Sequence, residues 1–321
     1  MRAVVYDRYG GPDRLRIEDV PAPSPAPGQV LVRVAATSVN LTDWEGLRGS
    51  PSYARIGGHL RPARRTLGSD IAGRVEAIGP GVTSFAPGDE VYGDNLGLKG
   101  GFAELAVMSE LGLAKKPDGL TFADASTIPQ AGAIAWQGVA GAEPGQRVLI
   151  NGAGGGSGSF AIQLAKRAGA HVTGVDNAGK LEFMRSLGAD EIVDYQSEDF
   201  TRPEEPYDLA LDLVGYRSVF AYRRSLAPGG QYRWVGGSVR ALLRVVTIGS
   251  IAGRLTGRRI GLLMVRQRPA YFEPLAELCL GGEIDIHIDR TYRLEEVPEA
   301  LRQVGEGRAL GKVVVEVDQP D

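Results

Sequence analysis

The chain has 321 residues, of which 43% are hydrophobic and 23% charged, and its net charge at neutral pH is −3. This length predicts two domains that each bury a core, and the composition excludes a disordered or fibrous protein. The small negative charge argues against a general nucleic-acid binder. The single cysteine, Cys279, excludes an internal disulfide and a four-cysteine zinc site. The N-terminus lacks the apolar core of a secretion signal and no apolar run is long enough to span a membrane, so we expect a cytoplasmic protein.

The first 120 or so residues are expected to be rich in β-strands. Short apolar or alternating runs recur at 30–34, 71–78 and 102–107, and proline and glycine interrupt them at 21–28 and 97–101. This spacing of short runs and turn residues is typical of strands joined by loops.

From about Thr121 the pattern changes to strands that alternate with helices. The alternation predicts a parallel sheet with helices on both faces. We therefore expect an α/β fold in which a β-rich lobe is combined with a doubly wound sheet. The predicted strands of the sheet occupy 148–150, 172–175, 191–193, 209–213 and 232–235, and a last strand occupies 313–317.

The stretch from Arg147 to Gly158 is the most informative one, and it reads R-V-L-I-N-G-A-G-G-G-S-G. A short apolar strand ends in a run with five glycines, and a helical pattern follows at once. Glycine tolerates the positive φ of a tight turn and lets a pyrophosphate approach the backbone, while the N–H groups of the new helix attract the anion. We expect Gly155 and Gly158 to approach the pyrophosphate, and a purely structural glycine turn is the alternative. The predicted dinucleotide-binding residues are Gly152, Ala153, Gly154, Gly155, Gly156, Ser157 and Gly158.

A second strand supports this prediction. It begins at His171 and ends at Asp176, about 18 residues after Gly158, where a nucleotide-binding fold presents an acid to the adenosine ribose. Ligands of open α/β sheets bind at the carboxyl ends of the strands. Later strand ends are therefore expected near the nicotinamide half, at Val214, Gly215, Gly236 and Gly237.

Seven motifs span nearly the whole chain in a fixed order. They are V-N-L-T-D-W-E-G-L-R-G at 39–49, L-G-S-D-I-A-G-R-V-E-A-I-G-P-G-V at 67–82, F-A-P-G-D-E-V-Y-G at 85–93, G-G-F-A-E at 100–104, N-G-A-G-G-G-S-G at 151–158, S-L-G-A-D-E-I-V-D-Y at 186–195 and G-K-V-V-V at 311–315. With them the chain resembles the medium-chain dehydrogenase/reductase superfamily, and within it the zinc-free quinone oxidoreductase branch. The resemblance implies a β-rich catalytic domain of residues 1–121 and 285–321, a Rossmann dinucleotide-binding domain of residues 122–284, and an active site in the cleft between them.

The resemblance also indicates where zinc would bind. Zinc-dependent members of the superfamily use a cysteine near position 40 and a histidine near position 69, where this chain has Asn40 and Ser69. Zinc needs three or four cysteine, histidine or acidic ligands. The three histidines, His59, His171 and His287, lie far apart in the sequence. We therefore expect no catalytic zinc.

Without a metal, nothing lowers the pKa of an alcohol for oxidation, so we expect reduction of an activated acceptor: a quinone, an enone or an enoyl thioester. The protein then aligns donor and acceptor and stabilises the developing enolate with a hydrogen bond. Asn40 is the candidate for that hydrogen bond, and Tyr53 and Tyr92 are the candidate proton donors. The alternatives are a turn-forming role for Asn40 and packing roles for both tyrosines. We expect Asp43 to brace the turn through an ion pair with Arg48.

The residues after the second strand bear on the choice of cofactor. Asp176 can accept both ribose hydroxyls and would repel a 2′-phosphate, which favours NADH. Asn177, Lys180 and Tyr195 fit the spacing with which the resembled branch binds that phosphate, although Gly179 stands where many relatives carry an arginine. The combination favours NADPH, with NADH as the alternative. A surface role for Lys180 and a packing role for Tyr195 are the structural interpretations.

No acidic residue occurs from Leu213 to Phe272, a stretch with eleven arginines. A basic surface or a subunit contact explains this pattern, and the functional alternative is a site for an anionic ligand such as a CoA-type thioester.

We expect a homodimer that acts on a small electrophilic molecule, with neither nucleic acid nor membrane as a partner. The apolar run 245–248 is predicted to be the edge strand of the nucleotide-domain sheet, and a second copy would cover that edge. The competing function is a non-catalytic nucleotide-binding sensor or structural protein. Ile134 supports it, because the resembled family commonly has a threonine hydroxyl there.

Overall fold

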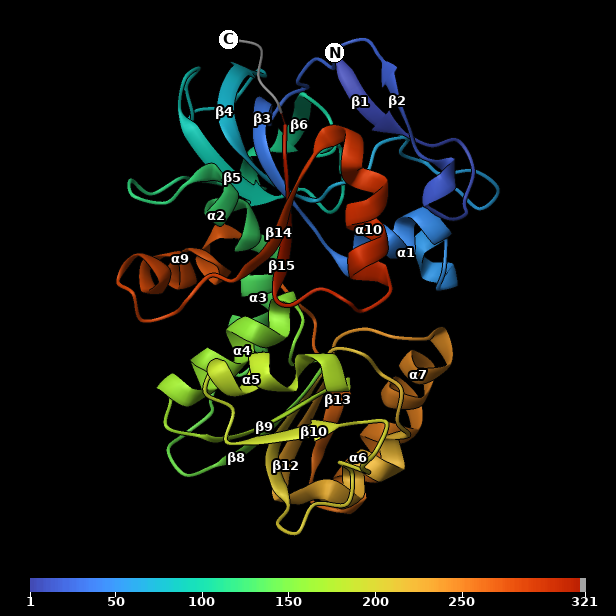
Figure 1. The fold of residues 1–321 in the computed structure, drawn as a ribbon. Helices are drawn as coiled ribbons and strands as arrows, with labels where there is room; N and C mark the ends of the chain where they lie inside the picture. The colour runs from blue at the N-terminus through green and yellow to red at the C-terminus, as the bar shows by residue number, and fades with distance from the viewer. Residues whose placement is uncertain (318–321) are drawn as a thin grey trace. The chain divides into compact units, whose positions relative to one another are not determined.

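The computed structural model describes residues 1–317, which form two compact units (Figure 1). Unit 1 consists of Met1–Ala133 and the described residues from Gln267 onward, and unit 2 is Ile134–Arg266. These divisions differ from the expected boundaries near 121 and 285. Helix α9 (Glu273–Leu280) belongs to unit 1. Phe272, which precedes that helix, packs edge-on against Tyr92 of unit 1, with 5.2 Å between the ring centres.

Unit 1 is built on a seven-stranded sheet in the order β14-β15-β3-β4-β5-β7, with β6 paired to β3. The last strand returns to the first lobe, since Val313 pairs antiparallel with Val39. A separate pair of antiparallel strands, β1 (Arg2–Val5) and β2 (Arg16–Asp19), lies at the N-terminus. The sheet strands are β3 (Gln29–Val39), β4 (Asp70–Ile78), β5 (Glu90–Asp94), β6 (Leu105–Ser109), β7 (Leu113–Lys115), β14 (Ile288–Arg293) and β15 (Lys312–Glu316).

Four helices besides α9 belong wholly or partly to unit 1. Helix α2 contacts β3, β4 and β15 and so covers the middle of the sheet. Helix α3 begins in unit 1 and continues into unit 2. The four helices are α1 (Leu41–Arg48), α2 (Phe122–Thr127), α3 (Pro129–Gly138) and α10 (Val297–Gly305), and short 3₁₀ turns occupy 12–14, 52–55, 110–112, 269–271 and 294–296.

The expected Asp43–Arg48 ion pair is wrong. The Asp43 carboxylate accepts the backbone N–H of Asn40 at 3.0 Å and so caps the start of α1, and its other oxygen lies 3.3 Å from Lys99 Nζ. Arg48 instead stacks on Trp44. Residues five apart on a helix point to different faces, whereas an acid in the first turn reaches back to the free N–H groups.

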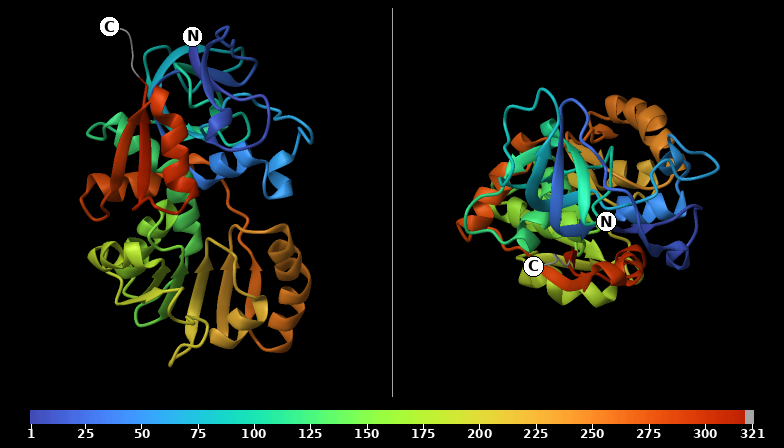
Figure 2. Two further views of the ribbon diagram at one scale, coloured as in Figure 1. Left: turned by 45° about the vertical axis from the view of Figure 1, so that its right-hand side comes forward. Right: turned by 90° about the horizontal axis from the view of Figure 1, so that it is seen from above.

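Unit 2 contains a six-stranded parallel sheet in the order β10-β9-β8-β11-β12-β13, and Figure 2 shows its strands running in one direction with helices beside them. This is the doubly wound sheet that the sequence predicts. Its strands are β8 (Arg147–Asn151), β9 (His171–Asp176), β10 (Glu191–Asp194), β11 (Tyr207–Asp212), β12 (Leu226–Trp234) and β13 (Arg259–Leu262). Its helices are α4 (Gly156–Arg167), α5 (Leu181–Ser186), α6 (Val219–Ser225), α7 (Val239–Arg244) and α8 (Ser250–Leu255), with a 3₁₀ turn at 178–180 and a π-helical turn at 245–249.

The apolar run 245–248 is not a strand, which corrects the expectation. It forms the π-helical turn between α7 and α8, and the strand at the edge next to β12 is β13. Val245 and Gly249 are buried four residues apart, while Val246 and Ile248 between them are exposed. Packing against the unit 2 core therefore overrides the strand preference of β-branched residues. Within residues 1–317, no helix is long and apolar enough to cross a membrane.

Candidate functional site

The glycine turn lies directly after β8, as the sequence predicts. Gly152 has φ +87°, and its N–H and that of Ala153 donate to Val175 O in the neighbouring strand. A Cβ on Gly158 would lie 2.3 Å from Gly152 O, so only glycine lets α4 pack this closely on the turn. At Gly155, by contrast, a Cβ would meet nothing closer than 3.5 Å. The open space at Gly155 fits a bound pyrophosphate, and so do the first N–H groups of α4, for which a helix supplies no partner of its own.

Asp176 ends β9 beside this turn, and its carboxylate is held by the glycine turn through one oxygen and by its own loop through the other. One oxygen accepts the N–H of Gly154 at 3.0 Å, and the other accepts the backbone N–H of Asn177 at 2.9 Å and its side-chain amide at 3.1 Å. These bonds turn the acid toward the glycine turn.

Lys180 is buried rather than a cation on the helix surface. Its ammonium lies 3.5 Å from the Asp176 carboxylate, and its side chain covers Gly154, where a Cβ would lie 2.6 Å from the lysine Cδ. Tyr195 is half exposed at the end of β10, and its N–H donates to Asp176 O. The structure therefore brings Asp176, Asn177, Lys180 and Tyr195 to one edge of the sheet.

The later strand ends of unit 2 are joined by a buried carboxylate that sequence reasoning missed. One Asp212 oxygen accepts the N–H groups of Val214 at 3.1 Å and Gly215 at 2.9 Å, and the other accepts the Tyr232 hydroxyl at 2.7 Å. A Cβ on Gly237 would lie 2.8 Å from Val214 O, so the loops after β11 and β12 touch. An aspartate that ends an apolar strand three residues before a glycine is the signal that could have identified Asp212.

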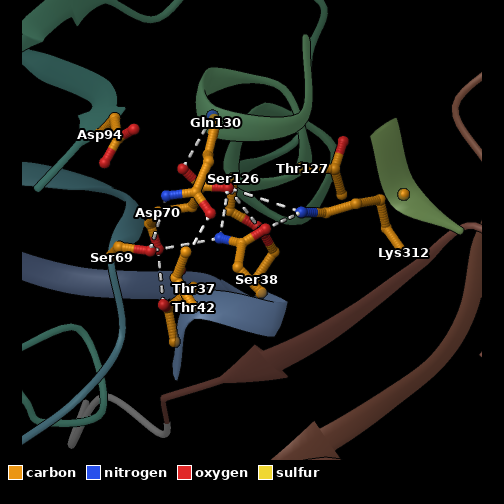
Figure 3. A network of polar contacts seen from close by, with 12 residues as sticks. Thr37, Ser38, Thr42, Ser69, Asp70, Asp94, Ser126, Thr127, Gln130 and Lys312 are labelled. Atoms are coloured by element: carbon orange, nitrogen blue, oxygen red, sulfur yellow. Dashed lines mark hydrogen bonds and ion pairs between the residues drawn. The ribbon is translucent and has the colours of Figure 1, made fainter. Parts of the chain in front are cut away.

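Unit 1 carries a second cluster of polar side chains around Asp70, drawn in Figure 3. Asp70 is fully buried at the start of β4. Its carboxylate accepts the Asn40 amide at 2.9 Å, the Ser38 hydroxyl at 3.1 Å and the backbone N–H of Gln130 at 3.0 Å. The end of β3, the start of β4 and the start of α3 therefore meet at one carboxylate.

Both the nitrogen and the oxygen of the Asn40 amide form hydrogen bonds in this cluster. Its nitrogen donates to Asp70 and also to Ser69 Oγ at 3.3 Å, and its oxygen accepts the ammonium of Lys312 at 2.8 Å. Gln130 also donates to Ser69 Oγ, at 3.4 Å, and accepts the Thr42 hydroxyl. Sequence reasoning placed Asn40 and Ser69 together at the metal position but missed Asp70 and Lys312, and only the G-K-V-V-V motif could have drawn attention to Lys312.

The two candidate tyrosines differ in their surroundings. Tyr92 is fully buried, and among residues 1–317 its hydroxyl has no hydrogen-bond partner. Tyr53 is half-buried, and its hydroxyl lies 3.5 Å from the Glu45 carboxylate. Burial raises the pKa of Glu45 to about 7.

Asp94 is a buried acid that faces Asp70 across the β4–β5 pair. One oxygen accepts the N–H of Leu96 at 2.8 Å, and the other has no partner among the described residues. Burial first, and then the Asp70 charge, raise the pKa of Asp94 to about 8.

This shift predicts a pH dependence of stability. The folded protein binds the Asp94 proton more tightly than the unfolded chain, so the stabilising contribution is complete below about pH 4 and is lost as the pH rises through about 8. A rise of 1 in the pKa on folding corresponds to about 1.4 kcal/mol of folding free energy. Urea unfolding from pH 5 to 9 should show a steeper loss of stability in the wild-type protein than in Asp94→Asn. Equal slopes for the two proteins would contradict the assignment.

The residues at the expected metal position do not fit zinc. Among residues 1–317, no three histidine, cysteine, aspartate or glutamate side chains gather as a metal site. Asn40 and Ser69 are hydrogen-bonded to each other, and the Lys312 ammonium beside them would repel a second cation.

Comparison with known proteins gives matches over nearly the whole chain. Residues 26–118 match the family model of the alcohol dehydrogenase GroES-like domain, and residues 187–315 match that of zinc-binding dehydrogenases. The chain is 32% identical to the chloroplastic quinone oxidoreductase QR1 of Triphysaria versicolor over 98% of both chains. It is 33% identical to the human mitochondrial NAD(P)H oxidoreductase RTN4IP1, over 99% of this chain and 89% of the relative. The solved structure of the quinone oxidoreductase from Coxiella burnetii superposes with a TM-score of 0.90 at 29% identity, over 99% of both chains.

Proposed function

The chain belongs to the medium-chain dehydrogenase/reductase superfamily, in its quinone-oxidoreductase-like branch, and is an NAD(P)H-dependent oxidoreductase; from this premise we propose that it reduces an activated acceptor without zinc. The acceptor is a quinone, an enone or an enoyl thioester. The observation that carries the proposal is the Asn40–Ser69–Asp70–Lys312 cluster, which places hydrogen-bond donors and an ammonium where zinc-dependent relatives bind a metal. Without a Lewis acid to activate an alcohol, an acceptor that is already electrophilic suits this cluster.

Each unit has a part in this proposal. When bound at the glycine turn of unit 2, the cofactor supplies the hydride. In unit 1, Asn40 donates a hydrogen bond to the acceptor oxygen on which negative charge develops. Tyr53 suits the role of proton donor better than Tyr92, because Glu45, with a pKa of about 7, stands behind its hydroxyl and can replace the proton.

Turnover with a panel of acceptors tests this function. Purified protein of known metal content is mixed with NADPH or NADH and with a benzoquinone, a simple enone or an enoyl-CoA, with and without a chelator. We expect oxidation of the cofactor with at least one acceptor, unchanged by the chelator. Loss of turnover on chelation that zinc restores would overturn the metal-free reaction. Tight cofactor binding without turnover on any acceptor would favour the sensor alternative. The apolar residue Ile134 supports that alternative.

We also propose that the cofactor is NADPH. Asp176 is held by Gly154, Asn177 and Lys180, so its charge is partly neutralised and does not face outward alone. Asn177, Lys180 and the half-exposed Tyr195 lie at the same edge and can bind a 2′-phosphate.

A cytoplasmic location stays a prediction, since the names of the two relatives above place those proteins in the chloroplast and in the mitochondrion.

A homodimer is the proposed assembly, and the exposed apolar surface of α7, α8 and the turn between them supports it. This face exposes large apolar side chains beside the edge strand β13, which α8 contacts. Such a patch is typical of a surface that a partner covers. The side chains are Leu243 (59% exposed), Val246 (51%), Ile251 (63%) and Leu255 (81%).

A charged substitution on this face should dissociate the dimer. We expect light scattering to give about twice 34.1 kDa for the wild-type protein and about 34.1 kDa for Ile251→Glu. Leu111→Glu is the matched control, because Leu111 is 70% exposed in unit 1, and it should remain dimeric. A wild-type mass near 34.1 kDa at every concentration would contradict the dimer.

A further inference from the structure

Lys312 is a buried cation at the start of β15, directly before three apolar residues of that strand. Its side chain is 2% exposed, and Val313, Val314 and Val315 after it are fully buried. The pairing of Val313 with Val39 brings Lys312 beside Asn40, the residue after Val39. A buried ammonium is unfavourable unless its partners compensate for the lost water. Its close partner here is an amide, not a carboxylate.

The distances define that partnership. Lys312 Nζ lies 2.8 Å from Asn40 Oδ1 and 3.5 Å from Asp70 Oδ2. Burial lowers the pKa of Lys312, and the Asp70 carboxylate opposes that shift. Figure 3 shows the lysine reaching from β15 toward the cluster around Asp70. The shorter contact identifies Asn40 as the group that Lys312 holds.

The Lys312 ammonium determines the orientation of the Asn40 amide. Lysine only donates hydrogen bonds, so Asn40 must turn its oxygen toward Lys312 and its NH₂ group toward Ser69 and Asp70. A charged donor on the amide oxygen also polarises the amide and strengthens its N–H groups as donors. Of the two N–H bonds, the one to Ser69 is longer, at 3.3 Å against 2.9 Å to Asp70. The hydrogen on the longer bond is the one that a stronger acceptor can take over.

We propose that Lys312 is a positioning residue for the reduction, which holds the Asn40 amide with a polarised N–H directed at the acceptor oxygen. This inference rests on the proposed function. Lys312 itself does not touch the acceptor. Its contribution appears in the rate of the chemical step, where charge develops on the acceptor oxygen, and not in cofactor binding by unit 2.

A double-mutant cycle separates this role from a structural one. Lys312→Met should lower kcat about tenfold or more, the effect of one charge-assisted hydrogen bond, and leave the Kd for NADPH unchanged. In an Asn40→Ala background the same substitution should change kcat less than about twofold, because the amide that Lys312 positions is gone. Lys312→Gln keeps a donor without the charge and should retain part of the rate, and it replaces Lys312→Met if that variant does not fold.

The control is Lys116→Met, which removes another lysine of unit 1 whose side chain is only 6% exposed and pairs with Glu90 at 2.9 Å. It should reduce stability but leave kcat unchanged and show no coupling to Asn40→Ala. Equal losses of kcat from Lys312→Met in both backgrounds would overturn the positioning role while the proposed function stands. Absence of turnover in the wild-type protein with every acceptor would overturn the proposed function, and this inference with it.

Discussion

Gly158→Ala is expected to abolish cofactor binding and to destabilise unit 2, whereas Gly155→Ala is expected to weaken binding while the fold stays intact. The added Cβ at Gly158 would lie 2.3 Å from Gly152 O and 2.5 Å from two backbone atoms of Ala153. Because these backbone atoms cannot move without disturbing the turn, α4 must shift. We expect this shift to lower the free energy of unfolding by about 3 kcal/mol. Denaturant unfolding and fluorescence titration with NADPH measure the two effects.

Gly155 provides the matched comparison. It has φ −92°, which any residue adopts, and a Cβ there meets nothing closer than 3.5 Å. Its methyl group enters only the space that we assign to the pyrophosphate, so the Kd for NADPH should rise about tenfold or more without a change in stability. Wild-type affinity in Gly155→Ala would show that the pyrophosphate does not lie at this turn.

Lys180→Ala should weaken NADPH about tenfold or more and leave NADH nearly unchanged. A charge-assisted contact to a 2′-phosphate contributes about 1.5–3 kcal/mol, and NADH lacks that phosphate. Removing Lys180 also frees the Asp176 carboxylate from the cation 3.5 Å away, which adds repulsion toward the 2′-phosphate that only NADPH carries. The Kd of each cofactor for both proteins is the measurement.

Lys166→Ala is the control for this prediction. Lys166 pairs with Asp190 at 2.8 Å at the other end of α4, so its removal changes the net charge equally without touching the proposed phosphate site. Equal small effects of Lys180→Ala on both cofactors would leave Lys180 as a partner of Asp176 alone and would contradict the choice of NADPH.

The parts of the molecule that the sequence predicts well are those fixed by local backbone chemistry. The turn from β8 to α4 needs glycine at Gly152 and Gly158 for reasons that involve only neighbouring residues. Asp176 follows one strand later at the same edge of a parallel sheet, so strand spacing alone places it. The alternation of strands and helices likewise predicts the doubly wound sheet of unit 2.

The remaining features depend on contacts between distant parts of the chain. Lys312 and Asn40 are 272 residues apart, and no periodicity or spacing indicates that a buried ammonium meets that amide. Nor does the sequence indicate that Asp43 pairs with Lys99, because the nearby Arg48 is the more obvious partner. At 245–248, local strand preference points the wrong way, because packing of α7 and α8 against the core decides the conformation.

Transfer of a labelled hydride tests the central claim most directly. Protein shown by metal analysis to hold no zinc is mixed, in the presence of a chelator, with NADPH deuterated at C4 of the nicotinamide and with an enone, and the product is examined by NMR. The account predicts deuterium on the β-carbon of the reduced enone, at the same rate before and after zinc is added in excess of the chelator. Transfer that begins only when zinc is supplied would contradict it.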